Sequence, residues 1–155
     1  MIICGYQGIG KSTVAGRNNI IDLESGNFWH KGQRPDNWYV YYCNIAEHLS
    51  KQGYIVLLSS HKVVRDRLRK YCNEPVRLIF PSLFLAEEWK RKLCDRYQST
   101  KSEKNFKAWQ NAKERYHENI AELMMAGIPF YEIKDMDYRL SDIIDYLVAE
   151  IEWEF

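Results

Sequence analysis

Residues able to hold a phosphate chain are concentrated at the start of the sequence. Gly5, Gly10, Lys11 and Ser12 have the spacing G-x-x-x-x-G-K-S, which is typical of a loop that wraps around nucleotide phosphates. Glycines let backbone N–H groups turn inward toward phosphate oxygens. The lysine can then reach the β- and γ-phosphates, and the serine can place its hydroxyl on Mg²⁺. The pattern predicts a site for ATP and Mg²⁺ built from Gly5, Gln7, Gly8, Ile9, Gly10, Lys11, Ser12 and Thr13.

The segments on either side of this loop fit the same interpretation. Residues 1–4 form a short apolar run typical of a buried strand, and a helix can begin at Lys11. That helix should be short and end near Arg17, because Gly16 and the following asparagines favour a turn. A helix that begins beside the phosphates adds partial positive charge. A glycine-rich turn that matches by chance would not require this order of strand, loop and helix.

Strand-like and helix-like segments alternate along the rest of the chain. Short apolar runs predict further strands at residues 20–23, 54–58, 76–80 and 130–133. Apolar residues at helical spacing predict helices at residues 37–52, 61–72, 82–97, 104–126 and from Ser141 onward, with a polar, mobile tip at 98–102. This alternation predicts a single α/β domain over residues 1–155, in which helices cover both faces of a five-stranded parallel sheet.

Two acidic residues lie at the end of the second predicted strand. Ligands of such sheets bind beyond the carboxyl ends of the strands. Asp22 and Glu24 lie two positions apart there, so their carboxylates can point the same way. They could hold a Mg²⁺-bound water, accept a proton from an attacking hydroxyl, or bind the hydroxyls of an acceptor. We therefore predict that Ser12 and Asp22 contact the metal and that Asp22 and Glu24 contact substrate; a solvated acidic turn is the alternative.

A histidine and an arginine follow the third predicted strand. Arg65 lies one helical turn after His61 and on the same face, so both can reach over the cleft. An arginine there can bind an acceptor phosphate or carboxylate through two parallel hydrogen bonds. We predict that both residues contact substrate, although His61 could instead cap the helix and Arg65 could lie on its solvent face.

The helix after the fourth strand carries a run of positive charge. Lys90, Arg91, Lys92 and Arg96 precede the polar tip, and cations on a movable segment can meet the charge that develops during phosphoryl transfer. An ordinary charged helix face, paired with nearby glutamates, is the alternative. Residues 25–37 carry Trp29, His30, Lys31 and Arg34, and this loop could either fold over an acceptor or serve packing alone.

The composition excludes several classes of protein. Hydrophobic residues make up 46% of the chain, which excludes a disordered or fibrous protein. The formal net charge of +1 gives no general attraction to nucleic acid, and no apolar run approaches the roughly 20 residues of a membrane span. Cys4, Cys43, Cys72 and Cys94 are far apart, which favours free thiols in a cytoplasmic protein. A monomer and a homodimer both remain open.

Several of these motifs together resemble one family. They are the phosphate loop, Asp22-Leu-Glu24 at a strand end, and the third strand followed by Ser-Ser-His-Lys-Val-Val-Arg. The segment Lys92-Leu-Cys-Asp-Arg96 is similar to the lid signature R-L-x-x-R, and residues 116–133 are similar to a long helix and last strand. The chain resembles the small P-loop kinases: nucleoside monophosphate kinases, shikimate and gluconate kinases, and the compact adenylate-kinase-like proteins of bacteriophages.

The resemblance implies a three-layer α/β/α P-loop NTPase fold with strand order 2-3-1-4-5 and a lid-like helical segment around residues 85–126. It also implies that Lys11 and Ser12 contact the donor phosphates, and that residues 134–138 contact adenine. Lys92 and Arg96 would be the lid pair that contacts the nucleotide. Lysine at the first lid position departs from the family, because lysine cannot make the bidentate contact of arginine.

We therefore expect an ATP- and Mg²⁺-dependent phosphotransferase acting on a small acceptor, with a nucleotide or nucleoside favoured. Lys11, Arg65 and Arg96 are the expected catalytic cations. One alternative is a nucleotide-binding module with weak or no kinase activity, and another is a kinase of a small metabolite, as in the shikimate and gluconate kinases. A kinase of nucleic-acid ends is disfavoured by the near-neutral charge.

Overall fold

Five parallel strands form the central sheet of the computed structural model, which describes residues 1–28 and 33–154. The strands lie in the predicted order, β2-β3-β1-β4-β5. Their bounds are β1 Ile2–Gly5, β2 Ile20–Asp22, β3 Ile55–Ser59, β4 Val76–Pro81 and β5 Phe130–Ile133. The predicted α/β class, parallel sheet and strand order are thus confirmed.

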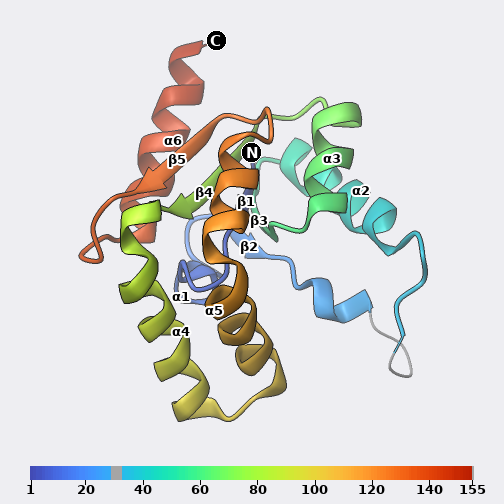
Figure 1. Ribbon diagram of the computed structural model, residues 1–155. Helices are drawn as coiled ribbons and strands as arrows, with labels where there is room; N and C mark the ends of the chain where they lie inside the picture. Colours follow the sequence, from blue (N-terminus) through green and yellow to red (C-terminus); the bar gives the residue numbers. More distant parts are fainter. Residues whose placement is uncertain (29–32, 155) are drawn as a thin grey trace.

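Six α-helices and two short 3₁₀-helices connect and follow the strands within the described residues. The α-helices are α1 Lys11–Val14, α2 Trp38–Lys51, α3 Lys62–Tyr71, α4 Ala86–Thr100, α5 Glu103–Met124 and α6 Leu140–Glu154, and the 3₁₀-helices are η1 Ser25–Phe28 and η2 Leu83–Leu85. α5 crosses in front of the sheet and α6 lies behind it (Figure 1). The sheet is therefore covered on both faces, as strands that are buried on both sides require.

The core is continuous from the sheet into the helices. Ile2, Ile3 and Cys4 of β1 are fully buried between β3 and β4. Trp89 of α4 and Tyr116 of α5 are the large side chains that close it on the lid side, with exposed fractions of 0% and 1%. The register places Gly5 beside Ser59 and Ile79. The residues that follow β1 and β3 are therefore neighbours at one edge of the sheet.

Three predictions about local structure were wrong. The expected mobile tip at residues 98–102 is a tight turn, because α4 continues to Thr100 and Ser102 caps α5 by accepting a hydrogen bond from the Asn105 N–H at 3.1 Å. The chain reverses at Lys101, with φ of 55°, and Ser102, which is extended. Ser141 does not cap α6, since that helix begins at Leu140. The expected first helix to Arg17 also ends earlier, at Val14.

The α4–α5 hairpin, residues 86–124, extends past the sheet on the side where α1 lies (Figure 1). Tyr97, Phe106 and Trp109 pack together toward its tip, with Tyr97 and Trp109 stacked at 5.9 Å. α5 is interrupted at Arg115, whose φ of −135° and ψ of 19° are not helical. The second arm of the hairpin thus contains a break between its tip and its end at Met124.

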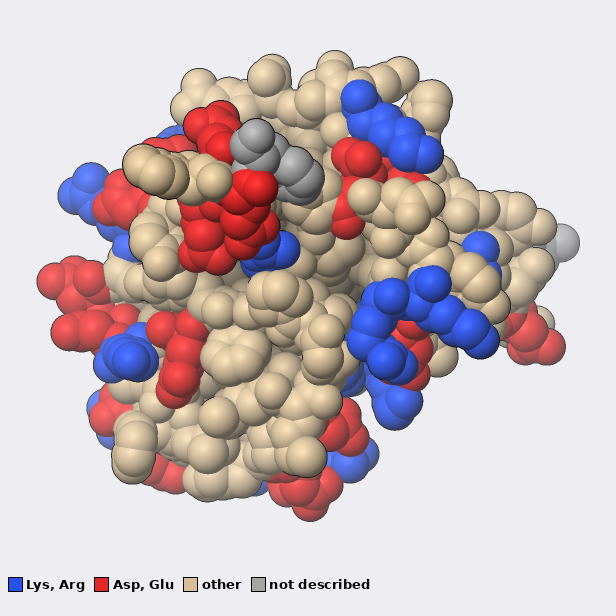
Figure 2. All heavy atoms as spheres, turned by 90° about the horizontal axis from the view of Figure 1, so that it is seen from above, with Lys and Arg blue, Asp and Glu red and all other residues tan. Residues whose placement is uncertain are grey.

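The opposite side of the molecule carries both chain ends. Figure 2 views this side and shows acidic side chains gathered over the last turns of α6. Two of these, Glu150 and Glu154, approach the buried guanidinium of Arg77 on β4, at 4.0 and 3.2 Å. These contacts attach the end of α6 to the sheet, far from the phosphate loop.

The four cysteines are free thiols, as predicted. Burial raises the pKa of both the Cys4 and the Cys43 thiol to about 12. None of the helices in residues 1–28 and 33–154 is both long and apolar enough to cross a membrane.

Candidate functional site

The loop between β1 and α1 has the backbone of a turn that only glycine accommodates easily. Gly8 and Gly10 have φ values of 91° and 103°, in the left-handed region. A Cβ atom at Gly8 would lie 2.9 Å from Leu93 Cδ2 and 3.2 Å from Trp89 Nε1 of α4. Glycine at this position is therefore required both by conformation and by the close approach of α4.

The Lys11 side chain points back toward Gly5, at the start of this loop. Its ammonium donates to the Gly5 carbonyl at 3.4 Å. Burial lowers the pKa of Lys11, while the nearby carboxylates of Asp22 and Glu24 act in the opposite direction. The lysine thus lies between the loop and the acidic pair, where it can contact both a phosphate and the groups beside it.

Two carbonyls of the loop are held by aromatic side chains from other segments. The Trp89 indole N–H of α4 donates to the Gln7 carbonyl at 2.9 Å. The Tyr138 hydroxyl, from the segment between β5 and α6, donates to the Ile9 carbonyl at 2.8 Å. Trp89 was not among the predicted site residues, and Tyr138 was included only as part of residues 134–138, the segment that the resemblance assigns to adenine contact.

Lys92, predicted as a lid cation, lies in an aromatic cage. Its ammonium is 4.4 Å from the centre of the Trp89 ring and 4.9 Å from that of Tyr138, and it donates to the Tyr138 hydroxyl at 2.8 Å. Burial, helped by nearby Arg96, lowers the pKa of Lys92 to about 8. Lys92 therefore contacts the loop through Tyr138.

Arg96 is the predicted lid cation that comes closest to the glycines of the loop. Its Nη1 atom is 3.6 Å from the place where a Cβ of Gly8 would be. Its Nη2 atom donates to Asn105 Oδ1 of α5 at 3.3 Å. The guanidinium thus bridges the two arms of the hairpin directly beside the loop.

An open groove runs between α4 and the segment that follows β5. Its volume is about 640 Å³, and Lys92, Arg96 and Met136 line it together with Glu88, Arg91, Asp95 and Ser99. Met136 belongs to residues 134–138, the segment that the resemblance assigns to adenine contact. Two of its lining residues, Lys92 and Arg96, are also those that approach the loop between β1 and α1.

The acidic pair lies beside Lys11, as predicted from its position after β2. Burial and the adjacent Glu24 carboxylate raise the pKa of Asp22, although Lys11 opposes this shift. Burial would also raise the pKa of Glu24, but its ion pair with Lys104 of α5, at 2.9 Å, outweighs burial and lowers it. Lys104 is a contact that the sequence did not predict.

Asp22 and Ser12 suit the way Mg²⁺ binds with a nucleotide. No group of three or more His, Cys, Asp or Glu side chains that could hold a metal occurs within the described part of the chain. Mg²⁺ usually takes one or two protein ligands and completes its shell with phosphates and water. Burial raises the pKa of Asp22, and the neighbouring Glu24 carboxylate raises it further, so a cation beside this half-buried pair would favour its charged form.

His61 and Arg65 lie after β3, near Lys11. The His61 ring packs edge-to-face on Trp38 and its Nδ1 atom is 2.6 Å from Ser59 Oγ. Burial lowers the pKa of His61, and the positive charges of Arg34, Lys11 and Arg65 lower it further. At neutral pH the imidazole is uncharged and is surrounded by cations that could receive an anionic group.

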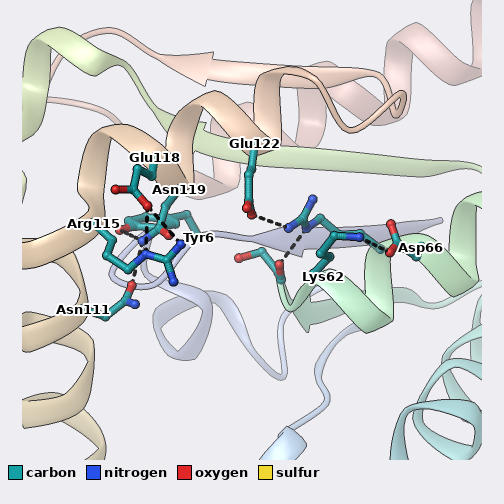
Figure 3. Close-up of polar contacts among 10 residues, drawn as sticks. Tyr6, Lys62, Asp66, Asn111, Arg115, Glu118, Asn119 and Glu122 are labelled. Carbon is teal, nitrogen blue, oxygen red and sulfur yellow. Dashed lines mark hydrogen bonds and ion pairs between the residues drawn. The ribbon is translucent and has the colours of Figure 1, made fainter.

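Arg65 is buried and partly engaged within the protein. Its Nε atom donates to the Ser60 carbonyl at 2.8 Å, and its Nη2 atom is 3.5 Å from a carboxylate oxygen of Glu122. Figure 3 shows Glu122 pointing from α5 toward α3, the helix that carries Arg65. An incoming anion would have to compete with Glu122 for this arginine.

α5 also contacts the phosphate loop itself. The side-chain amide of Gln7 donates to the Ala108 carbonyl at 3.0 Å and to Asn111 Oδ1 at 3.3 Å. Asn119 donates to Asn111 at 2.7 Å and to the Tyr6 hydroxyl at 3.5 Å, which links the two sides of the interruption at Arg115 (Figure 3). The predicted role of Gln7 in cofactor binding would thus fall to its backbone, since its side chain faces α5.

The structure brings Lys11, Asp22, Glu24, His61 and Arg65 to one edge of the sheet. Arg34, from the loop predicted to fold over an acceptor, joins them: its guanidinium lies 4.3 Å from the centre of the Trp38 ring. The other residues singled out in that loop, Trp29, His30 and Lys31, lie outside the described residues.

Comparison with known proteins adds no family to this picture. No family model matches the chain, and no match is found among curated proteins.

Proposed function

We propose that the chain is an ATP- and Mg²⁺-dependent phosphotransferase with a P-loop NTPase fold that transfers a phosphoryl group to a small acceptor, with a nucleotide or nucleoside favoured. The observation that carries the proposal is the position of Lys11. It begins α1 directly after a loop with two left-handed glycines, and it lies between that loop and two carboxylates. This combination is suited to a polyphosphate and its metal ion.

Each residue would have a defined task. The loop amides and Lys11 would bind the β- and γ-phosphates, and Ser12 with Asp22 would hold Mg²⁺. The ion, once bound, neutralises charge on the phosphates. Arg96 would bind the transferring group from the side of α4, while Arg65 and neutral His61 would orient the acceptor. Glu24 or Asp22 would accept the proton of the attacking hydroxyl, so catalysis would consist mainly of positioning and charge stabilisation.

Replacing Lys11 tests the proposal. Lys11→Met should weaken MgATP binding by about a hundredfold, since a charge-assisted contact to the phosphates is lost. It should change the unfolding free energy by less than about 1 kcal/mol, because methionine keeps most of the aliphatic stem. Binding is measured by calorimetry and stability by urea unfolding. Lys51→Met, in a surface ion pair with Glu47, is the matched control and should bind MgATP normally.

Turnover is tested by ADP release against a panel of nucleotides, nucleosides and sugar acids. Acceptor-dependent ADP release that Lys11→Met abolishes supports a kinase. If the wild-type protein does not bind MgATP, the proposed nucleotide site is refuted, and with it the proposed function.

A nucleotide-binding module without transferase activity is the second candidate. The ion pair of Arg65 with Glu122 favours it, because an arginine that is engaged internally is less available to an acceptor. Tight MgATP binding without ADP release for any acceptor would select this function.

A further inference from the structure

The phosphate loop is held from outside by two donors that belong to neither β1 nor α1. Trp89 donates its indole N–H to the Gln7 carbonyl at 2.9 Å, and Tyr138 donates its hydroxyl proton to the Ile9 carbonyl at 2.8 Å. Trp89 is fully buried, and the two rings stack at 6.0 Å with an interplanar angle of 20°. The donors therefore come from one rigid aromatic pair.

The direction of these carbonyls fixes the direction of the amides behind them. A trans peptide unit is planar, so its C=O and N–H bonds point in opposite directions. The Gln7 carbonyl shares its peptide unit with the Gly8 N–H, and the Ile9 carbonyl shares its unit with the Gly10 N–H. With both carbonyls turned toward the aromatic pair, both N–H groups turn away from it. No acceptor for either N–H is present in the part of the chain that the structure describes.

Because residues 8 and 10 are glycines, the loop needs the hydrogen bonds from Trp89 and Tyr138 to keep one backbone conformation. Residues 8 and 10 have no side chain that would restrict their rotation, and their peptide units can flip at little cost in an isolated loop. A flip of either unit would place a carbonyl oxygen where a phosphate oxygen must bind. A hydrogen bond to each carbonyl makes that flip unfavourable.

Lys92 determines which way the Tyr138 proton points. An ammonium group only donates hydrogen bonds, so the Tyr138 oxygen must accept from Lys92 at 2.8 Å. The hydroxyl proton is then directed to its other neighbour, the Ile9 carbonyl. The cation thus acts on the loop through the tyrosine.

We propose that Trp89 and Tyr138 are positioning residues that hold the Gly8 and Gly10 amides toward the phosphates of the nucleotide, and that Lys92 orients Tyr138 for this task. The inference rests on the proposed function, since it concerns the same phosphate site. It assigns Lys92 an indirect role, in contrast to the direct nucleotide contact that the sequence predicts for it.

Tyr138→Phe is the primary test, because it keeps the ring stack and removes only the hydroxyl. The probes are inorganic tripolyphosphate and ATP, each with Mg²⁺, titrated by calorimetry. The loss of one hydrogen bond should weaken both by about fivefold. Tyr131→Phe is the matched control: Tyr131 packs on Tyr146 through its ring, and its variant should bind both probes like the wild type.

A second readout separates positioning from packing. The ¹⁵N–¹H resonance of Gly10 should move in Tyr138→Phe and that of Gly8 in Trp89→Phe, while Gly53, in a distant turn, should keep its resonance. Unfolding free energies are measured for both variants, because Trp89→Phe also loses buried volume. A weaker affinity with an unmoved Gly10 resonance would overturn the proposal.

A double-mutant cycle tests the role of Lys92. If Lys92 acts through Tyr138, Lys92→Met should weaken tripolyphosphate binding in the wild type but not further in Tyr138→Phe. Additive losses would mean that Lys92 contacts the phosphates directly, which overturns this part of the inference.

The two proposals fail in different ways. If the wild-type protein binds neither tripolyphosphate nor ATP, the phosphate site itself is refuted and both proposals fall. If the wild type binds both and Tyr138→Phe binds them equally well, the positioning role is refuted while the proposed function stands.

Discussion

Lys92 illustrates how an aromatic cage can hold a partly buried cation beside the loop between β1 and α1. The ammonium sits against two ring faces, where it is attracted by their π-electrons. This attraction does not fully replace lost hydration, and the pKa of the group falls to about 8 as a result of burial. The charged form of Lys92 is therefore less favoured in the folded protein than in the unfolded chain.

This shift predicts how stability depends on pH. Between about pH 8 and the ordinary lysine pKa of 10.5 the unfolded chain binds the proton that folded Lys92 has released. Because the unfolded state binds more protons than the folded state in this window, the contribution of Lys92 to the unfolding free energy rises with pH. The unfolding free energy of the wild type relative to Lys92→Met should thus increase from about pH 7.5 to about pH 9.5.

Urea unfolding at the two pH values measures this difference. Other groups titrate in the same range, so only the difference between the two proteins is informative. Lys51→Met, which removes an exposed lysine, should run parallel to the wild type. A pH-independent difference between the wild type and Lys92→Met would contradict the prediction.

At the scale of elements, the loop and α1 depend on glycine for two separable reasons. Gly8 and Gly16 have similar φ values, 91° and 83°. A Cβ at Gly16 would meet no atom within 4 Å, whereas one at Gly8 would meet α4. Gly16→Ala should cost about 1 kcal/mol for backbone strain alone. Gly8→Ala should cost about 1–3 kcal/mol more, because α4 must move.

Chemical denaturation of both variants, with MgATP titration, checks this prediction. Only Gly8→Ala should also lose nucleotide affinity. If Gly8→Ala and Gly16→Ala lower the unfolding free energy equally, the close approach of α4 to Gly8 does not restrict the side chain at that position.

The elements that could be predicted from sequence are those with strong local signals. β3 begins with a continuous apolar run, Ile55–Leu58, and the loop after β1 has a fixed spacing, so β3 and the position of Lys11 could be located from local sequence. The strand order came only from the resemblance to the small P-loop kinases. The tip at residues 98–102 was misjudged because its polar composition is equally suited to the end of a helix. Lys104 and Glu122 could not be assigned to the site, because only the packing of α5 brings them to Glu24 and Arg65.

Trp89 and Tyr138 were missed for a related reason. Trp89 lies in the helix predicted at residues 82–97 and is fully buried. An indole N–H that is buried must find an acceptor, but the sequence does not reveal which carbonyl it reaches. Tyr138 lay within a segment assigned to adenine on position alone, while its hydroxyl contacts the phosphate loop.

At the scale of the whole molecule, the candidate site and the attachment of the end of α6 lie toward opposite ends of the strands. Arg77, with an exposed fraction of 6%, depends on Glu150 and Glu154 for its charge partners. Replacing both glutamates by glutamine should destabilise the protein by about 1–2 kcal/mol, because a buried charge is left without an anion. Arg77→Met should be nearly neutral, since methionine removes that charge and keeps the stem.

Urea unfolding and MgATP titration of these variants test the separation of the two sides. All should bind MgATP with wild-type affinity, because the altered contacts are remote from the phosphate loop. Greater destabilisation by Arg77→Met than by the double glutamine variant would refute the electrostatic explanation.

The path of α5 has a consequence for how the molecule would respond to two ligands at once. One helix contacts the loop between β1 and α1 through Gln7, the acidic pair through Lys104, and Arg65 through Glu122. An acceptor that displaced Glu122 from Arg65 would therefore also change α5, the helix that the loop between β1 and α1 contacts through Gln7. Such coupling is reciprocal. If the acceptor changes the affinity for the nucleotide by some factor, the nucleotide changes the affinity for the acceptor by the same factor.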